Sequence, residues 1–299
     1  MNLNIFKCVF LLLALVMTAC VNLKAVNDFA KTSKETVQDY SKSGISLTSS
    51  YKELMISKCL YNYNISEDTV VLDKVPKKLN DCFESETLRR YRKSDSLITL
   101  VNTVIERYFM GLEELSDNQV TSFQLNADDL ETLLRDKSTF PSVNDNHINA
   151  SKGIVNLLTN ASLEAYRQKE LAKVINEADE SLELVLEMYI AINKDIKEAL
   201  DIESLNNFQD YETALAAATN DFDKIKAGQA YLRYYNKVQS KIEINESFAK
   251  ALRQMIEGHK KLVENANKLD TKSLIKVIAS YTTDIVEIKN EINKLKQNE

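Results

Sequence analysis

The fold is decided by residues 154–200, which read IVNLLTNASLEAYRQKELAKVINEADESLELVLEMYIAINKDIKEAL. Most side chains that recur here at alternating steps of four and three residues are apolar, as they are along one face of an α-helix. We therefore expect one helix, about 70 Å long at 1.5 Å per residue. The expected stripe comprises Ile154, Leu158, Ala161, Ala165, Gln168, Ala172, Ile175, Asp179, Leu182, Leu186, Tyr189, Asn193, Ile196 and Leu200.

The same spacing recurs on both sides of this stretch. It predicts further helices over residues 26–54, 84–117, 208–266 and 272–295, with a short break at 201–207. Short connections between long amphipathic helices are typical of antiparallel neighbours. The sequence therefore predicts an all-α fold, an elongated up-and-down bundle of long antiparallel helices with coiled-coil-like packing.

Some residues predict where the helices begin or bend. Asp270 and Thr271 are expected to cap the last helix, and Asn126 a short helix near residues 127–135. Weak helix-forming residues predict a kink in the 208–266 helix, at Asn220-Asp221 or at Gly228.

Two stretches lack the helical spacing, residues 59–82 and 120–146. The β-branched run at 69–72 and the alternating run at 121–125 are compatible with a small two-stranded ribbon, and an irregular loop is the alternative. No linker rich in serine or glycine separates two domains. We therefore expect a single elongated helical domain over residues 26–299, with N-terminal helices and inserts in 26–146 and long C-terminal helices in 150–299.

The composition argues against most enzyme classes. The chain has 299 residues but only 5 glycines, 2 prolines and 2 histidines, and it contains no glycine-rich phosphate loop and none of the common hydrolase or zincin motifs. His147 and His259 are not preceded by the glutamate that a di-iron bundle requires. The sequence predicts a protein without catalytic residues, metal or cofactor, one that is not an enzyme.

The N-terminus has the features of an export signal. A start with one lysine, Lys7, precedes an apolar run of 12 residues, 8–19, which is too short to span a bilayer. The run ends Leu15-Val16-Met17-Thr18-Ala19-Cys20.

This ending resembles the lipobox of bacterial lipoproteins, although Met17 stands where leucine is usual. The resemblance implies a signal peptide over residues 1–19, removed before Cys20, and a diacylglycerol on the Cys20 thiol. It also implies a short tether at 20–25 and attachment to a lipid membrane. Val21 resembles the residue of lipoproteins sorted to the outer membrane, if the cell is Gram-negative. Ordinary cleavage that leaves Cys20 unmodified is the alternative.

Cys59 and Cys82 are the two cysteines that remain beside Cys20 and the signal's Cys8. Thiols oxidise outside the cytosol, so an even pair in an exported chain predicts a disulfide. It would stabilise the fold by about 3 kcal/mol in the chain-entropy model. Reduced cysteines or half of a metal site are the alternatives. Tyr61 and Tyr63, inside this loop, are the candidate partner-binding residues.

The charge argues against nucleic-acid binding. The formal net charge is −6, and removal of Lys7 with the signal makes it −7. Acids and lysines alternate at short spacing, so no basic stripe is available to neutralise phosphates.

Several polar residues interrupt the apolar stripes. His259 is expected at the seam between helices, partly buried, with a buried switch as the alternative. Gln168, Asp179, Asn193 and Glu246 are expected either to set helix register or to lie at the rim of the core, and a polar ligand channel is a sharper alternative. Tyr231 and Tyr235 share a helix face, which indicates core packing.

The function predicted from these features is a membrane-anchored lipoprotein of the cell envelope. It would serve as a helical scaffold or binding module for another envelope or extracellular protein. The alternatives are a periplasmic small-ligand carrier or enzyme accessory, and a helical pore-forming toxin component, against which the lack of a long apolar stretch argues.

Overall fold

A computed structural model describes residues 23–62, 75–117, 143–160 and 167–297. These residues form α-helices, one 3₁₀ turn and no strand, as the predicted all-α fold requires. In chain order the elements are α2 (Lys24–Ser41), α3 (Leu47–Asn62), α4 (Val75–Phe83), α5 (Glu86–Ser116), α7 (Asp145–Asn160), α8 (Arg167–Ala217), α9 (Asp221–Glu264), η1 (Ala266–Lys268) and α10 (Lys272–Lys296).

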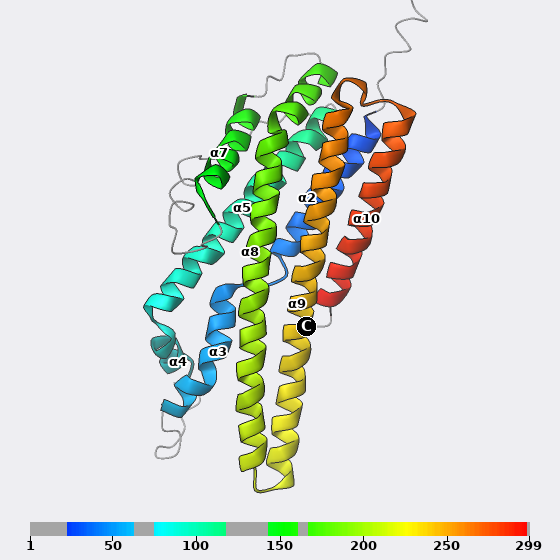
Figure 1. Cartoon of the computed structure of the whole chain (residues 1–299). Helices are drawn as coiled ribbons and strands as arrows, with labels where there is room; N and C mark the ends of the chain where they lie inside the picture. The colour runs from blue at the N-terminus through cyan, green and yellow to red at the C-terminus, as the bar shows by residue number, and fades with distance from the viewer. Residues whose placement is uncertain (1–22, 63–74, 118–142, 161–166, 298–299) are drawn as a thin grey trace, which may run out of the picture.

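The helices form an elongated, antiparallel bundle (Figure 1). Its longest members are α8, of 51 residues, and α9, of 44, which lie side by side as a hairpin. At 1.5 Å per residue α8 is about 76 Å long. Helix α2 packs against α5, α9 and α10, while α3 and α7 pack against α8.

The single helix predicted over residues 154–200 is two helices. α7 ends at Asn160 and α8 begins at Arg167, and the two pack side by side. Gly153 of α7 allows the close approach, since a Cβ there would lie 3.0 Å from the Ser181 hydroxyl oxygen. Apolar residues keep the helical spacing up to Ala165, so the stripe carries no sign of the reversal.

The break predicted at 201–207 is also wrong, because α8 continues to Ala217. Lys197 pairs with Asp201 at 2.9 Å, one helical turn on, and the Asn206 and Asn207 amides donate to carbonyls one turn back. The chain reverses instead before Asn220, whose side chain accepts a hydrogen bond from the Asp223 backbone N–H. Asn220 was expected to kink a helix, and it caps one.

The predicted 26–54 helix is interrupted at Gly44, between α2 and α3. Gly44 has a φ of 72°, which glycine adopts without a steric penalty. The new helix is then capped from another element. The Asp95 carboxylate on α5 accepts hydrogen bonds from the Leu47 and Thr48 backbone N–H groups, at 2.9 and 3.0 Å. Asp95, a charged residue inside the predicted 84–117 helix, thus fixes where α3 begins.

The helices predicted to start near residues 84 and 272 begin at Glu86 and Lys272. Ser85 caps α5 by accepting from the Leu88 backbone N–H at 3.0 Å. Thr271 is the extended residue before α10, although its side chain makes no capping hydrogen bond. The short helix near 127–135 and the possible ribbon between 69–72 and 121–125 lie outside the described residues.

The disulfide between Cys59 and Cys82 is confirmed, with Cα atoms 5.9 Å apart. It joins the end of α3 to α4, beside a small cluster of Cys59, Phe83 and Leu88. The disulfide therefore holds the ends of the 59–82 segment together beside the start of α5.

Aromatic rings fill the main core where α2, α5, α8 and α9 meet. Tyr40 stacks on Phe248 with ring centroids 3.8 Å apart, and Tyr189 meets Phe248 edge-on at 5.2 Å. Phe29 of α2 lies against Phe109 and covers the backbone of Gly258 in α9. The ring leaves no room for a side chain at this position.

Two glycines of α9 provide a matched test of this packing. A Cβ at Gly258 would overlap the Phe29 ring, whereas a Cβ at Gly228 meets no atom within 4 Å. We expect Gly258→Ala to lower the free energy of unfolding by about 1–3 kcal/mol through overpacking. Gly228→Ala should raise it by about 0.5–1 kcal/mol through helix propensity. Urea denaturation of both variants measures the difference, and equal effects would contradict the close approach of α2 and α9.

Candidate protein-binding surface

The site residues predicted from the sequence are largely outside the described part of the chain. Cys20 and Tyr63 lie outside it, and Tyr61 belongs to the last turn of α3, where side chains are not described. A different surface stands out among the described residues.

This surface is the hairpin arm, residues 201–237, formed by the end of α8 and the start of α9. Figure 1 shows that these two segments extend beyond α2 and α10. The arm carries eight of the nine large apolar side chains that are exposed among the described residues. They are Ile202, Leu205, Phe208, Leu215, Phe222, Ile225, Leu232 and Tyr235.

The sequence pattern explains the exposure. Phe208 and Leu215 of α8, and Phe222, Ile225 and Leu232 of α9, keep the three- and four-residue spacing of a helix face. The single helix predicted over 208–266 is wrong, because the chain reverses between Ala217 and Asp221. An apolar stripe is buried only where further helices cover it. α2, α3 and α10 end before they reach the tip of the hairpin arm (Figure 1). Phe222 is therefore 66% exposed and Leu232 58%.

Tyrosines hold the two helices of the arm together. Tyr231 of α9 lies between Phe208 and Tyr211 of α8, with ring centroids 5.9 and 5.7 Å away. Tyr211 also meets Tyr234 at 6.1 Å, and Tyr231 meets Tyr235 at 5.9 Å. The prediction that Tyr235 packs in the core is wrong, because it is exposed on the arm, and Tyr231 is only half-buried there. Such rings give the arm a rigid, amphipathic face.

A buried carboxyl group fixes the base of the arm. Glu203 of α8 is only 2% exposed; it accepts hydrogen bonds from the Ser50 hydroxyl of α3 and from the Tyr234 hydroxyl of α9, the latter at 3.0 Å. Asn207 donates to the same Tyr234 oxygen at 3.0 Å. Burial raises the pKa of Glu203, although its hydrogen bond from Ser50 and the Lys241 charge oppose the shift. Three helices are thus joined where the arm leaves the bundle.

Charges of opposite sign line the two helices of the arm. Exposed acids on α8 include Asp201, Asp210 and Glu212, whereas α9 carries Lys224, Lys226, Arg233 and Lys237 behind the acidic first turn of Asp221 and Asp223. The arm thus exposes apolar and charged side chains together, a combination that protein interfaces also contain.

The polar residues of the predicted apolar stripes differ in burial and in their contacts. His259 is 2% exposed, so it is fully rather than partly buried, and its Nε2 lies 2.6 Å from the Tyr108 hydroxyl. Its Nδ1 is 3.5 Å from an Asp179 carboxylate oxygen. The Asp179 charge favours the tautomer with the proton on Nδ1, in which the Tyr108 hydroxyl donates to Nε2. Burial lowers the pKa of His259, so the neutral ring serves as a hydrogen-bonded core residue.

Glu246 and Asn193 differ in burial. Glu246 is exposed and lies 3.7 Å from Lys197, which agrees with the second of the two alternatives, a position at the rim of the core. Asn193 is buried, and its Oδ1 lies 2.9 Å from the Tyr40 hydroxyl of α2. The Gln168 side chain is outside the described residues.

The described residues show neither a cluster of three potential metal ligands nor a helix with the length and hydrophobicity that a membrane span needs. No family model, curated protein or solved structure matches the chain. A functional interpretation must therefore be built from the chemistry of its surfaces.

Glu203 provides a pH test of the arm's base. Its raised pKa means that the folded chain holds this proton more tightly than the unfolded chain, whose glutamate pKa is about 4.3. Stability from this group is present below the unfolded pKa and is lost as the pH rises through the folded value. As the pH rises above the unfolded pKa of about 4.3, we expect Glu203→Gln to lose less stability than the wild type.

Urea denaturation at several pH values measures this difference. The control is Glu212→Gln, an exposed glutamate on the same helix, which should keep the wild-type pH profile. Parallel profiles for the wild type and Glu203→Gln would contradict the buried carboxyl group.

Proposed function

We propose that the chain is a lipid-anchored, extracytoplasmic scaffold that holds the hairpin arm away from the membrane to bind another envelope or extracellular protein. The exposed apolar side chains of the arm are the observation that carries this proposal. The lipobox-like residues at 15–20 supply the anchor, through a diacylglycerol on Cys20.

The arrangement of the helices supports the orientation. Along α2, Phe29 meets Gly258 of α9 and Tyr40 meets Asn245, so the two helices run antiparallel. The start of α2 is therefore level with the end of α9, about 60 Å from the tip of the arm by helical rise. Lys24 is four residues after Cys20, which allows at most about 14 Å of chain between anchor and bundle. An upright bundle would present the arm far from the lipid.

A protein is the partner that suits the arm. Its apolar side chains project from a two-helix face, and helix-on-helix packing covers such a face with apolar residues at three- and four-residue spacing. The acidic edge of α8 and the basic edge of α9 would orient a partner helix and exclude other directions. We therefore expect the partner to offer an amphipathic helical surface.

The anchor is tested by Cys20→Ser, which removes the acylation site. Two or more acyl chains hold a protein firmly on a membrane, so the variant should move from the membrane to the soluble fraction. The matched control is Cys8→Ser, a cysteine inside the expected signal, which should leave the protein in the membrane fraction. Unchanged fractionation of Cys20→Ser would remove the anchor from the proposal.

The binding surface is tested by placing the photocrosslinker p-benzoylphenylalanine at Leu232 of the full chain in cells. The control position is Val277 of α10, which is also exposed, at 40%, but lies off the arm. We expect a discrete adduct with another protein from position 232 alone. Phe222→Ser should reduce it at least tenfold, because Phe222 is the most exposed large apolar side chain of the arm and its truncation removes a large apolar contact.

Three results would contradict the proposed partner binding. They are an adduct that survives Phe222→Ser, equal adducts from positions 232 and 277, and an adduct only with a second copy of this chain. Thermal unfolding of Phe222→Ser, with an exposed residue changed, should match the wild type and exclude misfolding as the cause.

A further inference from the structure

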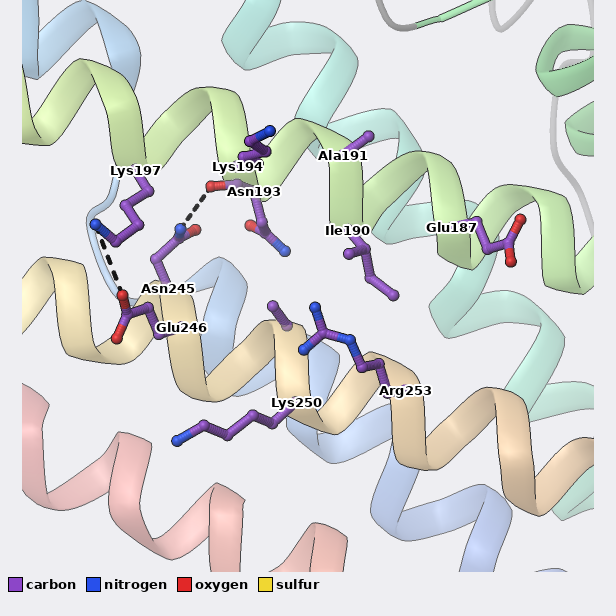
Figure 2. A pocket seen from close by; sticks show the side chains of 11 residues that line it. Glu187, Ile190, Ala191, Asn193, Lys194, Lys197, Asn245, Glu246, Lys250 and Arg253 are labelled. Atoms are coloured by element: carbon purple, nitrogen blue, oxygen red, sulfur yellow. Dashed lines mark hydrogen bonds and ion pairs between the residues drawn. The ribbon is translucent and has the colours of Figure 1, made fainter.

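A groove of about 490 Å³ lies between α8 and α9, closer to the middle of the bundle than the arm. Figure 2 shows its walls, with α8 on one side and α9 on the other. Ile190 and Ala191 of α8 and Ala249 of α9 form its apolar part. The hollow exists because two of these side chains are alanine, and its volume falls in the range of small-molecule sites.

Positive charge predominates around the groove. Lys197 is paired with Asp201 at 2.9 Å and with Glu246 at 3.7 Å. The other cations, Lys194, Lys250 and Arg253, form no ion pair with any described residue. Figure 2 shows the Arg253 guanidinium in the gap between the two helices, with Glu187 on the same wall as Ile190. A guanidinium in this position offers a planar, two-pronged donor to a carboxylate.

A buried amide adds a second polar contact. Asn193 is 1% exposed, it lines the groove, and its Nδ2 has no hydrogen-bond partner among the described residues. Figure 2 shows its amide between α8 and α9, on the side toward Ile190 and Arg253. An unpaired buried polar group costs about 1–3 kcal/mol, which a ligand that pairs with it would recover.

Neighbouring hydrogen bonds limit what this amide offers. The Tyr40 hydroxyl lies 2.9 Å from Asn193 Oδ1 and 2.8 Å from Asn245 Oδ1, yet its single proton serves only one of them. Asn245 is held by donation from its Nδ2 to the Asn193 carbonyl at 2.7 Å. The Asn193 side chain therefore presents its amide nitrogen to the groove or, if the amide group is rotated by half a turn, its amide oxygen. A ligand hydroxyl satisfies both arrangements, because it donates and accepts.

We propose that this groove binds a small organic acid with a carboxylate, an adjacent hydroxyl group and an apolar body. The carboxylate pairs with Arg253, with Lys250 and Lys194 adding positive potential. The hydroxyl group bonds to the Asn193 amide, and the apolar body covers Ile190 and Ala249. This site is separate from the hairpin arm and does not depend on partner binding there.

The test uses ligand-observed NMR titration of the full chain with three probes that share one apolar body. They are 3-phenyllactate, 3-phenylpropanoate, which lacks the hydroxyl group, and uncharged 3-phenylpropanamide. We expect 3-phenyllactate to bind at least threefold more tightly than 3-phenylpropanoate and at least tenfold more tightly than the amide. Equal affinity for all three probes, or no binding of 3-phenyllactate, would overturn the proposal.

Variants locate the binding. Arg253→Met keeps the apolar stem and removes the charge, and Ala249→Leu fills the hollow; each should weaken 3-phenyllactate binding at least fivefold. The matched control is Arg233→Met, an exposed arginine of the same helix on the arm, which should leave affinity unchanged. Affinity unchanged by both groove variants, or reduced equally by Arg233→Met, would place the binding elsewhere and overturn the proposal. Circular dichroism of each variant should match the wild type, because the substituted residues are exposed or half-buried.

Discussion

The structure depends on one constraint: the apolar face of α8 and α9 is buried only where other helices pack against it. α8 and α9 carry apolar residues at three- and four-residue spacing along most of their length, and burial of such side chains is the main source of stability. Over residues 167–200 and 238–264, α2, α3, α5, α7 and α10 provide that cover. Past these helices the pattern continues without cover, so the same sequence rule produces a core in one half of the hairpin and an exposed apolar face in the other.

Polar contacts inside the bundle fix how the helices fit together. The Tyr40 hydroxyl lies within hydrogen-bond distance of Asn193 and Asn245, Tyr189 bonds to Asn102, and Tyr108 bonds to His259. Each contact joins side chains from different helices. Apolar packing alone tolerates sliding by a turn, whereas a displaced register would leave these buried groups unpaired. Asp95 at the start of α3 and Glu203 at the base of the arm act in the same way. Together they determine where the arm emerges.

Local patterns predicted the helical class and many ends, and they failed where distant residues decided the outcome. The α5 start is fixed by the adjacent Ser85 side chain, and α10 begins directly after the extended residue Thr271. The start of α3 depends on Asp95, nearly fifty residues away, and the reversal between α7 and α8 depends on their packing against each other. The exposure of Phe222 and Leu232 could not be predicted from the sequence for a related reason. The spacing of an apolar stripe does not show whether another helix covers it. The groove could not be predicted either, because it forms only when Ala249 and Arg253 of α9 lie opposite Asn193 of α8.

An exposed apolar face invites self-association, and the arm contains features that limit it. Aromatic rings, mostly of tyrosine, fill the contact between its helices, and tyrosine carries a polar hydroxyl group that an aliphatic side chain lacks. The arm also places acids on α8 and bases on α9. Consider two copies that stand parallel on one membrane, with α8 of one copy facing α8 of the other. The acidic residues of the two α8 helices would then lie close together, and like charges at close range repel each other. If the anchor lies at the opposite end, as we propose, the tether itself would enforce this parallel arrangement. The charge pattern then disfavours that pairing while leaving the tip available to a partner that approaches from outside.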